Sequence, residues 1–211
     1  MKNKEEKMEQ KNILKNYVVE YKEKLNRLID SIDLDILHEI IETMVEAFKN
    51  NKTLYICGNG GSAATASHMQ VDIGFFVRYF VEKRPKVRSL TDNTPFITAI
   101  GNDNGYDEVF VEQMKDNFVE GDVLLAISAS GNSMNVVKAA EYANENGGTS
   151  IGFVGFQGGK LKDAAKLCLY TPNPKGEYGP IEDIHMILGH LIVTYFAKHK
   201  EFLKFGNPQN N

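Results

Sequence analysis

The segment DVLLAISASGNS at residues 122–133 is the most informative part of the sequence. Its first half is a continuous apolar run typical of a buried strand, and its second half is a Ser- and Gly-rich turn that opens a helix. Three hydroxyl groups, on Ser128, Ser130 and Ser133, accompany the free backbone N–H groups of that helix start. This arrangement suits a phosphate group. The simpler alternative is that Ser133 only caps the helix.

A second turn of this kind, CGNGGS at residues 57–62, follows the apolar run TLYIC at residues 53–57. Its glycines allow positive φ angles and a close approach of a ligand to the backbone. The helix that follows, expected over residues 63–76, offers N–H groups to an anion. A plain strand-to-helix turn is the alternative. The turn GNGGSA at residues 58–63 has Ala where the dinucleotide motif G-x-G-x-x-G has its last Gly, and no P-loop pattern occurs. Neither of these two nucleotide-binding classes is therefore expected.

Strand, glycine- or serine-rich turn and helix recur along the chain. We expect further strands at 87–90, 149–154 and 166–170, and helices at 106–118, 134–146 and 180–198. The alternation predicts an α/β fold, a three-layer sandwich of about five parallel strands with helices on both faces. Ligands of such sheets bind at the carboxyl ends of the strands, where both turns would lie.

Residues 1–50 carry apolar side chains at helical spacing and predict two amphipathic helices, the second capped by Asp33. Helices of this kind pack on the core that follows them or on another subunit. We therefore expect a single domain over residues 1–211. Residues 1–50 would serve packing or oligomerisation, and residues 53–198 would form the α/β core.

The composition excludes several classes of protein. With 24 Lys and Arg against 28 Asp and Glu, the net charge is −4, so a large basic face for nucleic acid is not expected. No run of 18 apolar residues predicts a membrane span, and the charged N-terminus contains no apolar leader. The two cysteines, Cys57 and Cys168, lie in apolar runs, which predicts buried, reduced thiols in a cytoplasmic protein.

Two places carry side chains suited to acid–base or metal chemistry. His68 and Asp72 are four residues apart on an expected helix and share one face, which fits a metal site or a simple ion pair. Spacing alone favours the ion pair. His190 lies on the apolar side of the last helix, beside Ile187 and Leu191, and by pattern alone is an ordinary core residue.

Five motifs, taken together and in order, resemble the SIS (sugar isomerase) domain family, and within it the phosphoheptose isomerases. They are GNGGSAATASH, IGNDNGY, GDVLLAISASGNSMNVVKAA, GFQGG and IEDIHMILGH, and the resemblance spans about residues 54–196. It implies a homotetramer that isomerises sedoheptulose 7-phosphate to D-glycero-D-manno-heptose 7-phosphate. It also implies a small-molecule sugar phosphate as the partner, with neither nucleic acid nor membrane.

The resemblance assigns the substrate-binding residues. It implies phosphate binding by the Ser128–Ser133 turn, with Ala129 where the family often has Thr, so that one hydroxyl donor is missing. Sugar contacts are implied for Asn59, Gly60 and Ser62 of the first turn, for Asp92 and Asn93, and for Glu182. Phe76 replaces a family Arg, which leaves the identity of the sugar less defined than the fold.

The resemblance also assigns catalysis and metal binding. His68 falls on a family metal ligand, and Asp72 falls on a catalytic Glu that is also a ligand, although Asp is one methylene shorter. His190 matches the second catalytic residue, again a ligand, and Glu182 matches a Gln ligand. One Zn²⁺ per subunit is therefore implied. Because eight helical residues span about 12 Å, Glu182 and His190 would meet on one ion only if Glu182 preceded the regular helix, or they would serve sites in different subunits.

Three alternatives remain at this stage. A close relative of these isomerases is a non-catalytic tetrameric adaptor for the bacterial replication initiator, and it lacks the residue matching His190. SIS-type transcription regulators carry a DNA-binding domain in front, for which residues 1–53 look too short. The third alternative is an isomerase of another sugar phosphate. The leading expectation is an isomerase with Asp72 as base and His190 as acid and base.

Overall fold

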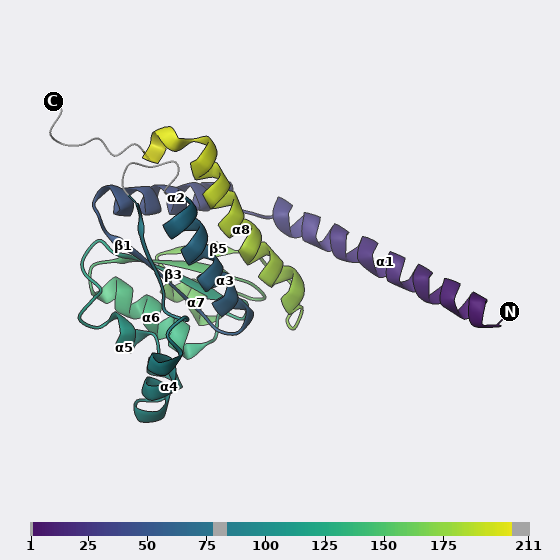
Figure 1. Ribbon diagram of the computed structural model, residues 1–211, viewed down its shortest axis with the longest axis horizontal. Helices are drawn as coiled ribbons and strands as arrows, with labels where there is room; N and C mark the ends of the chain where they lie inside the picture. Colours follow the sequence, from purple (N-terminus) through teal and green to yellow (C-terminus); the bar gives the residue numbers. More distant parts are fainter. Residues whose placement is uncertain (1, 78–83, 204–211) are drawn as a thin grey trace.

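A single parallel sheet forms the centre of the protein (Figure 1). The computed structural model describes residues 2–77 and 84–203, and within them five strands lie in the order β2-β1-β3-β4-β5. The strands are β1 (Thr53–Gly58), β2 (Lys86–Ser89), β3 (Val123–Ser128), β4 (Thr149–Val154) and β5 (Leu167–Tyr170). All neighbouring pairs are parallel. The predicted α/β sandwich is confirmed.

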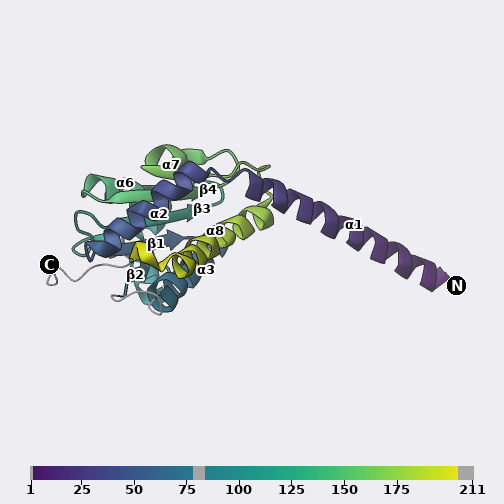
Figure 2. The same ribbon diagram turned by 90° about the horizontal axis from the view of Figure 1, so that it is seen from above.

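Helices cover both faces of the sheet, as Figure 2 shows from above. One face packs against α2 (Leu34–Lys49), α3 (Gly61–Val71) and α8 (Tyr178–Lys198), and the other against α5 (Val111–Met114), α6 (Met134–Glu145) and α7 (Gly159–Ala164). Successive residues of β3 alternate between the two cores: Leu125 and Ile127 face α8, whereas Leu124 and Ala126 face α6. A strand buried on both faces reads as a continuous apolar run, which is why DVLLAI was so clear in the sequence.

A buried carboxylate joins the starts of the two central strands. Asp122, which is 2% exposed, accepts a hydrogen bond from Thr53 N at 2.8 Å and another from Val119 N at 3.0 Å. These bonds compensate the cost of burying the charge. They also set the start of β1 beside the start of β3, so that both strands reach the opposite edge of the sheet together.

The long N-terminal helix α1 (Lys2–Asp30) extends away from the domain (Figure 1). Only its last turns contact the body, where Tyr21 donates a 2.5 Å hydrogen bond to Asp183 of α8 and Lys24 pairs with Glu177 at 2.7 Å. The bond to the Asp183 carboxylate raises the pKa of Tyr21 to about 12. Asp33 caps α2 by accepting from two backbone N–H groups, as predicted.

The helices differ from the expectation in two places. Residues 94–103, for which no element was predicted, form α4 (Thr94–Asp103), a helix without buried residues and therefore without a strong apolar stripe. Residues 106–118 are not one helix. They contain the 3₁₀ turn η3 (Tyr106–Glu108) and the short α5, and Lys115 and Asp116 leave helical geometry, Asp116 with a φ of 65°.

The two thiols differ in burial. Cys57 is buried, and burial raises the pKa of its thiol, whereas Cys168 is half-buried with a pKa raised to about 11, chiefly by burial. Their strands, β1 and β5, are separated by two others, a distance of about 14 Å that no disulfide spans. Among the described helices, none is both long and apolar enough to cross a bilayer.

A histidine lies inside the core between α8 and the sheet. His185 is 1% exposed, stacks near Phe153 of β4, and neither ring nitrogen has a hydrogen-bond partner among the described residues. His185 was expected to be a helix-capping residue or a support for the neighbouring site residues, and its place in the core contradicts that expectation. Burial lowers its pKa to about 3, so the ring is neutral in the folded chain at pH 7.

This burial predicts a specific acid sensitivity. In the unfolded chain His185 binds a proton below about pH 6.5, whereas the folded chain excludes it down to about pH 3. The free energy of unfolding should therefore fall as the pH drops below 6.5, by about 2 kcal/mol at pH 5 from this residue alone. In denaturant titrations at several pH values, a His185→Leu variant should lose that part of the fall in the free energy of unfolding. A variant of the exposed His38 should keep it. Equal slopes for all three proteins would contradict the prediction.

Candidate functional site

The two turns singled out in the sequence lie side by side at the carboxyl edge of the sheet. One follows β1 and the other follows β3, and these strands are neighbours, paired from Leu54 with Val123 to Gly58 with Ile127. The helix after β1 covers one face and the helix after β3 covers the other. Because the helices that follow these two parallel strands cross to opposite faces of the sheet, a crevice opens between the two turns. Doubly wound sheets bind their ligands at such a place.

The Ser128–Ser133 turn is organised by its own hydroxyl groups. Ser128 Oγ accepts from Gly131 N at 3.1 Å, and Ser130 Oγ accepts from Asn132 N at 3.2 Å. Ser133 occupies the N-cap position of α6, yet its side chain makes no capping bond. The alternative interpretation, that the Ser133 side chain only caps the helix, is therefore wrong. Ala129 is 6% exposed and packs into the core on the α8 side, so only its backbone is available to a ligand.

The GFQGG motif at residues 155–159 packs against the Ser128–Ser133 turn, and this contact explains its glycines. Gly131 has a φ of 64°, and a Cβ atom there would lie 1.8 Å from the carbonyl oxygen of Gly158. Leu161 N donates to Gly131 O at 2.8 Å. Only glycine therefore fits at position 131. The start of α7 holds the turn in place through this contact and this hydrogen bond.

The first turn is joined to the second by a pair of amides. Asn59 Nδ2 donates to Asn135 Oδ1 at 2.9 Å, and Asn135 Nδ2 donates to Asn59 Oδ1 at 3.0 Å. The hydroxyl of Tyr106 also donates to Asn59 Oδ1, at 2.9 Å. Sequence reasoning missed Asn135 and Tyr106. Only their positions in the sequence could have indicated them: Asn135 comes two residues after Ser133, and Tyr106 ends the IGNDNGY motif.

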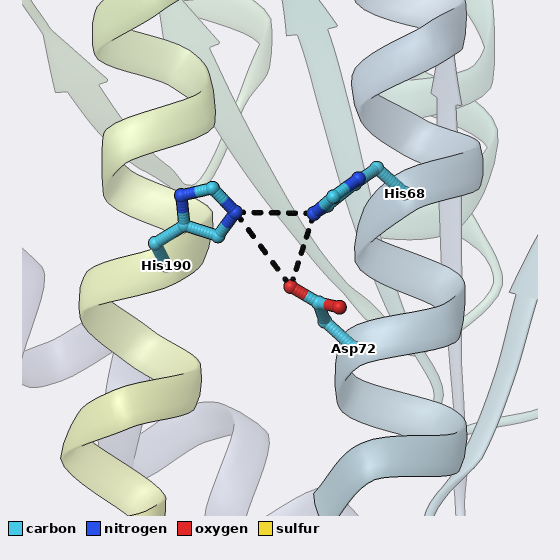
Figure 3. Close-up of side chains that lie close together, drawn as sticks. All are labelled: His68, Asp72 and His190. Carbon is cyan, nitrogen blue, oxygen red and sulfur yellow. Dashed lines mark hydrogen bonds and ion pairs between the residues drawn. The ribbon is translucent and has the colours of Figure 1, made fainter.

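A cluster of three ionisable side chains bridges α3 and α8 (Figure 3). His68 Nε2 lies 3.0 Å from His190 Nε2 and 3.2 Å from Asp72 Oδ2, and Asp72 Oδ2 lies 3.8 Å from His190 Nε2. The two rings meet edge to face. Exposed fractions of 46%, 25% and 51% leave His68, Asp72 and His190 open to a ligand. The pattern-based reading of His190 as a core residue is wrong.

Close helix packing brings the two histidines together. Gly189 precedes His190 and lies against Met69, which follows His68, and a Cβ atom at position 189 would be 3.0 Å from Met69 Cγ. A larger residue would push α8 away from α3. Asp72 begins a π-helical turn, η1 (Asp72–Phe76), and π turns often occur at functional sites because they redirect a side chain.

The donor set of this cluster suits Zn²⁺. Two imidazole nitrogens and one carboxylate oxygen are ligands that zinc prefers. Ligand atoms around a tetrahedral zinc with bonds near 2.0 Å lie about 3.3 Å apart, and the three separations here are 3.0, 3.2 and 3.8 Å. All three atoms lie within 4.8 Å of one another. Small shifts of the side chains would complete three of four tetrahedral positions and leave one open.

Glu182, the expected fourth ligand, is not part of this cluster. Regular helix begins at Tyr178, so the idea that Glu182 precedes it is wrong, and the eight-residue separation from His190 is fully helical. The Glu182 carboxylate instead lies over Gly61, where a Cβ atom would be 2.4 Å from Oε2. Gly61 is the first residue of α3, so the carboxylate faces the positive end of that helix.

Asp92 and Asn93 are engaged in structural contacts. Asp92 accepts from Ser67 and from Gln70 of α3, the latter at 3.1 Å, and Asn93 caps α4 by accepting from Phe96 N at 3.3 Å. Both side chains thus tie the segment after β2 to its neighbours. Their part in binding a sugar stays a prediction.

Comparisons with known proteins agree with this architecture. The family described as SIS domain matches residues 16–155. The phosphoheptose isomerase of Aneurinibacillus thermoaerophilus is 38% identical over 167 residues, covering 78% of this chain and 82% of the relative. That of Clostridium acetobutylicum is 36% identical over 180 residues, covering 85% of this chain and 89% of the relative. The structure of phosphoheptose isomerase from Neisseria gonorrhoeae matches with a TM-score of 0.75 at 29% identity, over 90% of this chain and 98% of that one.

The family match extends over well more than half of the chain, and both relatives exceed 30% identity over more than two thirds of it. The resemblance carried by the five sequence motifs is thereby confirmed. The chain belongs to the SIS domain family, and within it to the group of the phosphoheptose isomerases.

Proposed function

We propose that this protein is an aldose–ketose isomerase that interconverts sedoheptulose 7-phosphate and D-glycero-D-manno-heptose 7-phosphate. The observation that carries the proposal is the meeting of Asp72 and His190 across α3 and α8, in a chain similar over most of its length to proteins named phosphoheptose isomerase. A non-catalytic adaptor would not need an exposed base and acid held face to face.

The reaction moves one proton between adjacent carbons through an enediol. Asp72 takes the proton from C1 of the ketose and returns it to C2, which converts the ketose to the aldose. His190 donates a proton to the carbonyl oxygen and accepts one from the neighbouring hydroxyl. Its Nε2 lies 3.8 Å from Asp72 Oδ2, so the two groups can face adjacent atoms of one substrate. Zn²⁺ held by His68, Asp72 and His190 would polarise the carbonyl in place of the His190 proton, because an Nε2 atom that binds the ion cannot also carry that proton.

The Ser128–Ser133 turn and Asn59, Gly60 and Ser62 bind the rest of the substrate. The phosphate lies at the start of α6, where backbone N–H groups and hydroxyls replace its water shell without a full positive charge. Binding energy from this remote group positions the reacting end and lowers the barrier of the chemical step.

The first prediction concerns the catalytic histidine. Wild-type protein should isomerise sedoheptulose 7-phosphate, and His190→Ala should lower kcat about 10²- to 10⁴-fold, because the loss removes a positioned acid and base. His38→Ala is the matched control, since His38 is an exposed helical histidine that pairs with Glu42 at 3.4 Å. A His190→Ala enzyme with wild-type kcat would refute the assignment of this residue.

The second prediction concerns the metal. Purified protein should contain about one zinc per chain, and His68→Ala should lose it, because removal of one of three clustered ligands leaves too few. His38→Ala should retain the zinc. Elemental analysis and activity before and after chelation measure both effects. Absence of zinc in the wild type, together with activity that a chelator does not change, would exclude the metal.

The third prediction concerns the assembly. One face of α1 exposes large apolar side chains, with Ile13, Leu14, Tyr17 and Val18 each more than half exposed, and this long helix stands clear of its own domain. Within residues 1–50, α2 therefore packs on the sheet and α1 acts in oligomerisation, and residues 53–198 form the core of one domain. Light scattering should return about four times the 23.7 kDa chain mass. The mass of a single chain would contradict a tetramer.

The reduced, separated thiols fit a cytoplasmic enzyme.

A further inference from the structure

We propose that Tyr106 is a positioning residue that fixes the side-chain amide of Asn59, so that Asn59 presents an N–H donor, and never its oxygen, to the substrate. The inference rests on the proposed function, since it concerns how the first turn recognises the sugar phosphate. It assigns to Tyr106 and Asn135 roles in substrate recognition that neither the sequence motifs nor the ionisable cluster on α3 and α8 suggested.

The oxygen of Asn59 is fully occupied in the structure. It accepts from the Tyr106 hydroxyl at 2.9 Å and from Asn135 Nδ2 at 3.0 Å, which uses both of its lone pairs. One hydrogen of Asn59 Nδ2 goes to Asn135 Oδ1 at 2.9 Å. The second hydrogen has no such partner within this network, and it is the only polar element that the amide can still offer. A ligand at this position must therefore supply an acceptor, such as a sugar hydroxyl or carbonyl oxygen.

The orientation of Asn135 is fixed independently. Its Oδ1 also accepts from Val136 N at 3.0 Å, and the side chain is 2% exposed. Since a backbone N–H can only donate, Asn135 must keep its oxygen toward the start of α6. The nitrogen of Asn135 then faces Asn59 and requires the Asn59 oxygen at that place. The Tyr106 hydroxyl, which can donate or accept, donates to this oxygen and holds the side chain in position.

Tyr106 itself is held by the element that carries it. It opens η3 directly after Gly105, whose φ of 96° turns the chain back toward the sheet. Two residues later Glu108 accepts from Lys138 of α6 at 2.6 Å. The ring of Tyr106 is 58% exposed and has little packing of its own, so its hydroxyl is its principal attachment to the site. Three segments distant in the sequence thus meet at one amide.

The test removes only the hydroxyl. Tyr106→Phe should raise both the Kd for sedoheptulose 7-phosphate, measured by calorimetry, and its KM about 3- to 10-fold, the effect of one hydrogen bond. kcat should change less than twofold. The rise in melting temperature caused by inorganic phosphate should stay as in the wild type, because phosphate alone occupies the serine turn. Tyr142→Phe, which removes a hydroxyl seven residues beyond Asn135 on α6, is the matched control and should behave as wild type.

A second arm asks whether Tyr106 acts through Asn59. In an Asn59→Ala background, Tyr106→Phe should change the Kd no further. A Kd unaffected by Tyr106→Phe, an effect of equal size without Asn59, or a parallel loss of the phosphate-induced shift would each overturn the inference. Turnover separates it from the proposed function: a wild type that binds the sugar phosphate without isomerising it refutes the proposed reaction, while the calorimetric comparison still decides the role of Tyr106.

Discussion

The parallel pairing of β1 with β3 is the constraint on which the rest of the structure depends. Both strands are buried on two faces, and the Asp122 carboxylate aligns their starts. Because their helices leave toward opposite faces, the turns that follow the two strands diverge and open a crevice at the carboxyl edge. The Ser128–Ser133 turn, the turn at residues 57–62 and the amide pair between them all follow from this one pairing.

The cluster of His68, Asp72 and His190 needs a second condition, a close approach of α3 and α8. His68 and His190 are 122 residues apart in sequence and their Nε2 atoms are 3.0 Å apart in space. Gly189 makes that approach possible because it has no side chain to hold the helices apart. The fold therefore brings together two separate groups of residues. The two turns lie at strand ends, and the cluster of His68, Asp72 and His190 lies between helix faces. His68 lies seven residues, about 10 Å of helix, beyond the Gly61 at the first turn.

Not every expected residue joins these two groups. The carboxylate of Glu182, a residue of α8, lies against the start of α3 rather than with the histidines, because an unbroken helix from Tyr178 separates Glu182 from His190. His185, one turn beyond Glu182, faces the core with no polar partner among the described residues. The single helix α8 thus presents one carboxylate to the turn at residues 57–62, one neutral imidazole to the interior and one exposed imidazole to the cluster with His68 and Asp72.

The sequence by itself determined the sheet, because strands buried on two faces leave continuous apolar runs and the turns between strand and helix need glycine or serine. It also placed the serine-rich turn at residues 128–133 after a central strand, because the residues of that turn are contiguous. It did not determine α4, which buries no residue and so has no apolar stripe. Only the tertiary structure decided which side chains from distant segments meet, namely His68 with His190 and Tyr106 with Asn59. Such contacts depend on the packing of whole helices, and no local spacing along the chain encodes that packing.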